Sequence, residues 1–129
     1  MIARKQGHYS EAKHYLQESL ALASQLGRSF GICATLYELG DLSISEGDTS
    51  LAEEYFKKML EEIPSGDQEF LAFAYYGLAR VCALQGDREH ARLYGNKSVA
   101  LFEAMEHRNL AEVREWMKSA LGSTPEVEE

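Results

Sequence analysis

The fold is decided by three stretches that align with one another: Gly7-His-Tyr-Ser-Glu-Ala-Lys-His-Tyr-Leu16, Gly47-Asp-Thr-Ser-Leu-Ala-Glu-Glu-Tyr-Phe56 and Gly86-Asp-Arg-Glu-His-Ala-Arg-Leu-Tyr-Gly95. Each stretch begins with glycine and has an alanine five residues later. The glycines recur with a period of about 40 residues, and self-similarity at a fixed period is the signature of a repeat architecture. The chain is therefore expected to be an array of similar units.

Apolar residues before the second and third glycines follow the periodicity of a helix. They are Leu36, Leu39, Gly40 and Ser43 before Gly47, and Tyr75, Leu78, Ala79 and Cys82 before Gly86. Both sets have the i, i+3, i+4, i+7 spacing of one helix face. Because helical periodicity also continues after each glycine, we expect the glycine to form the turn of a helix hairpin.

Helix starts and close packing have their own signals. Thr49 or Ser50 and Asp87 are suitable N-caps, and Glu53 completes a capping box with Ser50. Small residues allow paired helices to approach closely, and these residues are Gly40, Ala52, Ala79 and Ala91.

The patterns predict six helices, over residues 8–26, 29–45, 49–62, 67–84, 88–105 and 108–121. Proline and glycine in the segment 63–66 predict a firm break between two hairpins. Residues 122–129 are acidic and are expected to be a disordered tail.

The two ends of the array differ. The helix over 108–121 has an apolar face and a polar one but no turn glycine after it, which is typical of a capping helix. The first repeat begins at Gly7, so its second helix is expected to expose an apolar stripe: Ala12, Leu16, Leu20 and Ala23. Either the chain is a fragment or has a frayed end, or this stripe is a self-association edge that a second copy covers.

Composition limits the possible partners. The chain has 129 residues with a net charge of −8, which disfavours nucleic acid and anionic membranes. No apolar run approaches the length of a membrane span or a signal peptide, and the two cysteines have no metal-binding or disulfide pattern. A reduced, cytoplasmic protein is expected.

Catalytic chemistry has no motif in this sequence. No two of the four histidines lie at i, i+4, so no metal site is predicted. Cys33 and Cys82 lie where small apolar residues pack, and adjacent glutamates such as those at 53–54 diverge into solvent. No phosphate-binding glycine loop occurs. We expect neither an enzyme nor a bound cofactor.

The repeat resembles the tetratricopeptide repeat, on residues that match the motif of that family: Leu36, Leu39, Gly40, Gly47, Ala52 and Phe56, then Tyr75, Leu78, Ala79, Gly86 and Ala91. It departs from the motif at Gly95, where an aromatic is usual, in the absence of a starting Trp, and in its longer period. The resemblance implies an all-α, right-handed solenoid of antiparallel helix hairpins. Repeats of this length are similar to those of large bacterial signalling ATPases and transcriptional activators.

The resemblance also implies a concave, peptide-binding groove along the first helices of the repeats. The matching positions are Tyr37, Asp41, Phe73, Tyr76, Arg80, Arg114 and Lys118. Aromatics beside three cations favour an acidic or amphipathic peptide. The alternative is that some of these tyrosines simply pack between helices. The chaperone-binding branch of the family has Lys and Asn where this chain has Tyr37 and Asp41, so a chaperone co-factor is not expected.

Together these observations predict one domain over residues 1–121, with a half repeat at 7–26, full repeats at 29–62 and 67–105, and a capping helix at 108–121. The first hypothesis is a protein-interaction scaffold or regulatory arm that binds a peptide or partner segment in the groove. The second is a homodimerisation module that uses the incomplete first repeat. A helical enzyme or small-molecule sensor is a third alternative without a supporting motif.

Overall fold

The computed structural model describes residues 2–122, and the side chains of residues 8–122. This part of the chain contains helices and no strand. The helices are α1 (Ile2–Leu26), α2 (Ser29–Glu46), α3 (Thr49–Glu62), α4 (Gln68–Leu84), α5 (Arg88–Met105) and α6 (Leu110–Leu121). The predicted all-α hairpin fold is confirmed, and residues 123–129 of the tail predicted over 122–129 lie outside the described residues.

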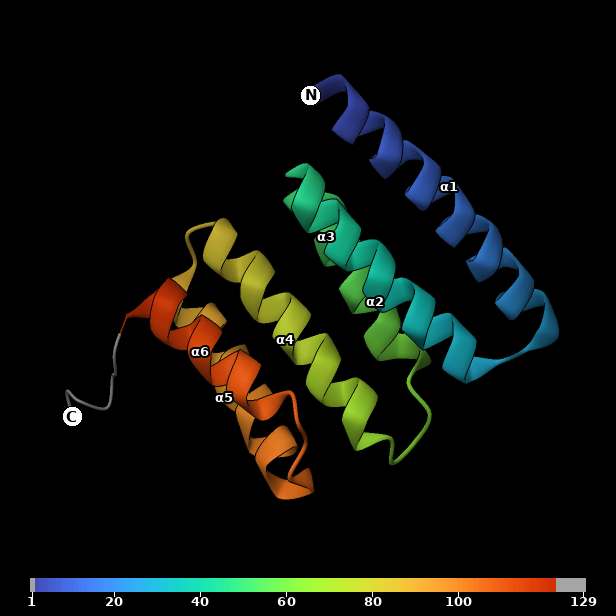
Figure 1. The fold of residues 1–129 in the computed structure, drawn as a ribbon. Coiled ribbons are helices and arrows are strands. Elements are labelled where there is room, and N and C mark those ends of the chain that lie inside the picture. Colours follow the sequence, from blue (N-terminus) through green and yellow to red (C-terminus); the bar gives the residue numbers. More distant parts are fainter. Residues whose placement is uncertain (1, 123–129) are drawn as a thin grey trace. The chain divides into compact units, whose positions relative to one another are not determined.

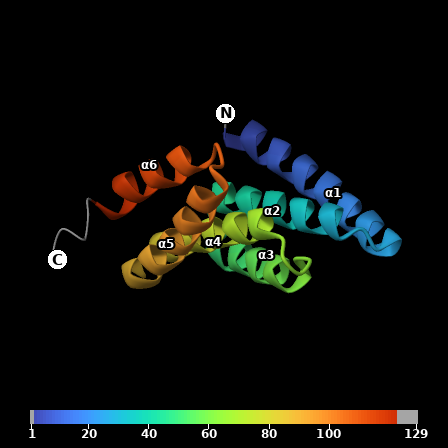
Figure 2. The same ribbon diagram turned by 90° about the horizontal axis from the view of Figure 1, so that it is seen from below.

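The chain divides into two compact units at the predicted break. Unit 1 is Met1–Gly66 and contains α1, α2 and α3, and unit 2 is Asp67–Glu129 and contains α4, α5 and α6. Figures 1 and 2 show that the helices within each unit follow one another up and down. The sequence also predicted that all helices form a single domain and a right-handed superhelix. Both expectations depend on how the two units are arranged, and they stay predictions.

The first helix is longer than the sequence pattern indicated. It begins at Ile2, not at residue 8, and Gly7 lies inside it. The prediction that Gly7 forms a hairpin turn was therefore wrong. A glycine inside a helix costs about 1 kcal/mol relative to alanine, and the good helix formers before it, Arg4, Lys5 and Gln6, offset part of that cost.

The other two repeat glycines do form turns. Gly47 and Gly86 have φ values of 84° and 85°, a left-handed conformation that favours glycine over residues with a Cβ. The residue after each glycine caps the next helix: Leu51 N–H donates to Asp48 Oδ1 at 3.1 Å, and His90 N–H donates to Asp87 Oδ1 at 3.1 Å. Asp87 was the predicted cap, whereas Asp48, and not Thr49 or Ser50, caps α3.

The core of unit 1 lies between α2 and α3. Leu36, Leu39 and Phe56 are fully buried there, and Gly40 faces the Phe56 ring so closely that a Cβ at residue 40 would lie 2.5 Å from it. The glycine is therefore required by the close approach of α3 and not by a turn. On the other side of α2, α1 packs antiparallel, with Lys13 Nζ 3.5 Å from Glu46 Oε1.

The core of unit 2 joins all three of its helices. Its buried cluster is Ala72, Tyr76, Phe102 and Val113, one or two residues from each of α4, α5 and α6. Ser98 Oγ, fully buried on α5, donates to the backbone oxygen of Ala72 at 2.8 Å. Gly95, the departure from the family motif, faces Met117 of α6, and a Cβ at residue 95 would lie 2.9 Å from that side chain. The glycine thus makes room for the capping helix.

Candidate functional site

The predicted groove residues of unit 1 lie on α2. Tyr37 is half-buried, and its ring centroid lies 5.6 Å from that of Phe56 in a tilted arrangement. Part of Tyr37 therefore packs between helices, as the alternative interpretation held. Asp41 is also half-buried and lines a hollow.

This hollow lies between α1 and α2 and has a volume of about 270 Å³. It is lined by Leu16, Glu38, Asp41, Leu42 and Ser45. The two leucines offer apolar surface, and Glu38 and Asp41 place two carboxylates within one helical turn. Such a hollow is suited to an apolar side chain that is followed or preceded by a cation.

The predicted groove aromatics of unit 2 belong to its core. Tyr76 is only 4% exposed; its hydroxyl donates to Glu112 Oε2 at 3.3 Å, and its ring meets Trp116 edge-on. The Phe73 ring packs edge-on against the rings of Phe102 and His107, with centroid distances of 5.0 Å and 5.7 Å. The reason is the position of α6, which covers this face of α4. Within unit 2, these two side chains leave little surface for a peptide.

The predicted cations of unit 2 differ in their surroundings. The guanidinium carbon of Arg80 lies 4.4 Å from the centroid of the Tyr76 ring, a cation–π contact within the unit. Arg114 Nη2 donates to Glu103 Oε2 at 3.2 Å, and both side chains are more than half exposed. Lys118 is exposed, one turn further along α6. The positive surface of unit 2 is therefore smaller than the three cations in the sequence suggest, because Arg80 and Arg114 each contact another side chain.

The predicted self-association edge faces α2. Ala12, Leu16, Leu20 and Ala23 are all half-buried, and a Cβ built on Gly31 of α2 would lie 3.3 Å from the Cβ of Ala23. The hairpin with α2 covers much of this stripe, which the sequence predicted to be open. Among residues 8–26 of α1, the large apolar side chains that are exposed are Tyr15, Leu22 and Leu26.

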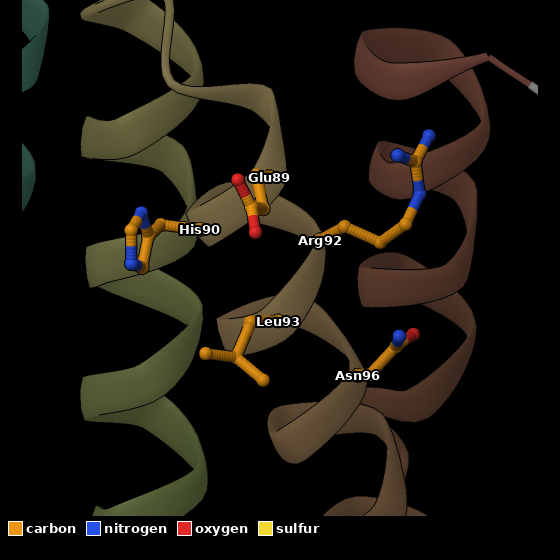
Figure 3. A pocket seen from close by; sticks show the side chains of 5 residues that line it. All are labelled: Glu89, His90, Arg92, Leu93 and Asn96. Carbon is orange, nitrogen blue, oxygen red and sulfur yellow. The ribbon is translucent and has the colours of Figure 1, made fainter.

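A second hollow, of about 480 Å³, lies along α5 in unit 2. Figure 3 shows its lining residues, all of them on α5: Glu89, His90, Arg92, Leu93 and Asn96. Arg92 points toward α6, where its Nη2 donates to the oxygen of Leu121 at 3.1 Å. The wall is mixed in charge and comes from a single helix, so it has no convergent set of donors for a particular ligand.

The carboxyl group of Asp87 is more acidic in the folded chain than an ordinary aspartate. The hydrogen bond from the backbone N–H of His90 lowers the pKa of Asp87 below its ordinary value of 3.8, and the His90 ring, 2.8 Å away, adds to this. Among residues 8–122, no three His, Cys, Asp or Glu side chains converge in a way that could hold a metal ion. Cys33 is buried, and Cys82 is half-buried.

Several residues of the unit 1 surface were not singled out in the sequence. Phe30, at the start of α2, is 73% exposed and lies seven residues before Tyr37, on the same helix face. Extending the spacing of Tyr37 and Asp41 backwards along the helix would have found it. Glu38, Leu42 and Ser45 were missed because they line the hollow only when α1 is in place.

Antiparallel helix hairpins that follow one another along the chain and present surface hollows define a helical-repeat module. The family model described as tetratricopeptide repeat matches residues 32–104. The chain belongs to the tetratricopeptide-repeat family, whose role is protein–protein interaction. In the described part of the chain, no helix is both long and apolar enough to cross a membrane.

Curated relatives were found along most of the chain. It is 31% identical over 126 residues to the photosystem I assembly protein Ycf3 of Dioscorea elephantipes, a match that covers 97% of this chain and 63% of that protein. It is 28% identical over 129 residues to Ycf3 of Sorghum bicolor, covering 92% of this chain and 70% of that protein. The chain thus spans about two thirds of the length of these relatives. Comparison with solved structures gave no significant match.

Proposed function

We propose that the chain is a non-catalytic scaffold that binds a segment of a partner protein on unit 1, in the hollow between α1 and α2. The observation that carries this proposal is the lining of the hollow, in which Leu16 and Leu42 lie beside Glu38 and Asp41. The exposed Phe30 at the start of α2 adds an aromatic anchor to the same unit. Aromatic side chains of this kind dominate binding energy at protein interfaces.

The chemistry of the hollow selects its ligand. The exposed carboxylate of Glu38 favours a segment with Lys or Arg next to an apolar side chain, and the net charge of −8 attracts the same kind of segment over longer range. This reverses the sign expected from the sequence, because the cations that suggested an acidic peptide lie on unit 2, where Tyr76 and Glu103 already engage Arg80 and Arg114.

An acidic segment is our second candidate ligand, on the surface of α6 alone. Arg114 and Lys118 are exposed there four residues apart, a spacing that puts both cations on one side of the helix.

A pair of peptides tests the choice. An amphipathic peptide with lysines and its counterpart with glutamates are titrated against the whole chain, with Glu38→Lys as the test variant and Glu54→Lys, on exposed α3 surface, as the control of equal charge. We expect the basic peptide to bind the unaltered chain and to lose about tenfold in affinity with Glu38→Lys only. Equal losses in both variants would reduce the effect to net charge and reject the hollow.

The relatives extend the proposal to a process. Because Ycf3 is a photosystem I assembly protein, we propose that this chain holds a segment of a subunit while a larger complex is assembled. Co-purification of the tagged chain with and without Glu38→Lys tests this: a subunit of a multiprotein complex should be retained by the unaltered chain and lost from the variant. The bacterial signalling origin and the cytoplasmic location expected from the sequence stay predictions.

Homodimerisation through Ala12, Leu16, Leu20 and Ala23 has less support, because these residues face α2. Sedimentation of the chain at high micromolar concentration tests it, and a monomer would remove this alternative.

A further inference from the structure

Helix α1 presents an apolar face that is distinct from the one it packs on α2. Tyr15 is 68% exposed, Leu22 is 56% exposed and Leu26 is 55% exposed. Their spacing, i, i+7 and i+11, places all three on one side of the helix. Three large exposed apolar side chains on one face of a helix are typical of an interface.

The aligned repeats show what this face does elsewhere in the chain. When the repeats are aligned so that Ala12 corresponds to Ala91, Tyr15 corresponds to Tyr94 and Ser19 corresponds to Ser98. Tyr94 stacks on Tyr75 of α4, with ring centroids 5.8 Å apart and planes 22° from parallel. Ser98 is fully buried and donates to the backbone of α4. In α5, therefore, this is the face that packs on the preceding helix.

The same alignment extends to the end of the helix. Leu22 and Leu26 correspond to Leu101 and Met105, both of which are half-buried against the core of unit 2. In unit 1, among the described residues, α1 packs on α2 and makes no comparable contact with α3. Figure 1 shows α1 with α2 on one side of it. The Tyr15 face of α1 thus has the residues for a helix–helix contact and is exposed.

We infer that the Tyr15 face of α1 docks an amphipathic helix of a partner protein, antiparallel to α1. Helices α2 and α4 pack on the equivalent faces of α3 and α5, so their sequences indicate which residues the partner helix should carry. They share a pattern of small–x–x–large–x–x–Leu–small: Cys33, Leu36, Leu39 and Gly40 in α2, and Ala72, Tyr75, Leu78 and Ala79 in α4. The small residue meets the serine, and an aromatic stacks on the tyrosine, as Ala72 and Tyr75 do with Ser98 and Tyr94.

Charge selects a partner helix over a second copy of the chain. Glu11 and Glu18 are exposed beside Tyr15, at four residues before and three after it. A second α1 lying against the first would bring these carboxylates close to their own copies, and like charges at such distances repel. A helix that carries Lys or Arg along its edges complements them instead.

The test uses a defined helix as the probe. A fluorescein-labelled peptide repeats residues 67–84 of this chain, with two lysines added at each end, and is titrated against the full chain. The test variants are Leu22→Glu and Tyr15→Ser, and the control is Ala21→Glu, which adds the same charge at an exposed position on another side of α1. Because all three residues are exposed, each variant should keep the helix content and melting temperature of the unaltered chain.

We expect the peptide to bind the unaltered chain and Ala21→Glu equally, and to bind each test variant about tenfold more weakly. Absence of binding, or equal weakening by Ala21→Glu, would overturn the proposal. So would a chain that sediments as a dimer and becomes a monomer with Leu22→Glu, because a second copy would then occupy the face. Since Glu38→Lys does not alter this face, the result is independent of the hollow between α1 and α2.

Discussion

Single glycines set the distances between helices in this protein, and Gly40 has the tightest contact. A Cβ there would lie 2.5 Å from two atoms of the Phe56 ring, which is itself fully buried. Phe56 therefore has no free space into which it could withdraw. The position requires glycine although its backbone is ordinary helix.

Gly40→Ala tests this contact. Overpacking costs about 1–3 kcal/mol, and the better helix propensity of alanine returns about 1 kcal/mol, so we expect a net loss of up to about 2 kcal/mol of unfolding free energy. Urea denaturation measures it. Adding Phe56→Leu to Gly40→Ala should cost less than the sum of the two single changes; additive losses would show that the ring is not the cause.

Glu106 is the one residue other than glycine with positive φ in the described part of the chain, at 53°. It ends α5 in a left-handed conformation that glycine adopts without a Cβ penalty. Glu106→Gly should therefore raise the unfolding free energy by about 0.5–1 kcal/mol. Thermal denaturation measures the change, with Glu106→Ala as the control. A destabilising glycine would mean that the Glu106 side chain contributes more than its backbone strain costs.

Asp87 makes the start of α5 sensitive to acid. Its pKa is lower in the folded chain than its ordinary value of 3.8, chiefly through the hydrogen bond from His90 N–H. A group with a lowered pKa stabilises the fold above its unfolded pKa and loses that contribution as the pH falls through the folded value.

The difference in melting temperature between the unaltered chain and Asp87→Ala should therefore be constant above about pH 5 and shrink as the pH falls below the ordinary pKa of 3.8. Scanning calorimetry at a series of pH values measures it. A difference that stays the same at low pH would assign the effect of the substitution to something other than the carboxylate.

At the scale of the element, the C-terminal end of α6 is held by two arginines of α5. Arg88 donates to the oxygens of Ala120 and Leu121, and Arg92 donates to that of Leu121. The last carbonyls of a helix have no partner within it, and cations stabilise that negative end. The two side chains thus fasten the capping helix to its unit.

Replacing both arginines, Arg88→Ala with Arg92→Ala, should loosen α6 while leaving α4 in place. We expect amide hydrogen exchange in the last turns of α6 to quicken by about tenfold, because charged hydrogen bonds of this kind contribute about 1.5–3 kcal/mol. Arg108→Ala, an exposed arginine in the turn before α6, is the control. Uniform quickening across α4, α5 and α6 would indicate global destabilisation and contradict a local role.

Helix identity could be predicted from sequence because apolar periodicity and turn glycines such as Gly47 and Gly86 are local signals. Side-chain exposure could not, because it depends on which helix lies opposite. Tyr76 matches a ligand-facing position by family register, yet α6 covers it, and Leu16 fits an open stripe, yet α2 lies against it. The hollow beside Asp41 exists only between two helices, so no single segment encodes it.

At the scale of the whole molecule, unit 2 has a core of its own. The cluster of Ala72, Tyr76, Phe102 and Val113 comes entirely from residues 67–122, as do the hydrogen bonds of Ser98 and Arg92. A unit with its own hydrophobic core can fold alone. A unit of this size buries a smaller fraction of its surface than a larger domain does, so its stability is low.

A fragment of residues 67–122 should therefore be helical and melt cooperatively, at a lower temperature than the full chain. Circular dichroism during heating measures both properties. Phe102→Ala in the fragment is the reference for a lost core, because truncation of a buried phenylalanine costs about 3–5 kcal/mol. A fragment that resembles this variant, without a transition, would contradict an independent core.

The exposed faces of α1 and α6, the first and last helices of the described chain, differ in chemistry. The surface of α6 is charged and therefore hydrated; its exposed residues include Glu112, Arg114, Glu115 and Lys118. The surface of α1 is apolar where it exposes Tyr15, Leu22 and Leu26. For an engineer who wishes to lengthen such a protein, extra hairpins belong ahead of α1, where an apolar seam is ready for them. Addition after α6 first requires a new apolar surface in place of its charges.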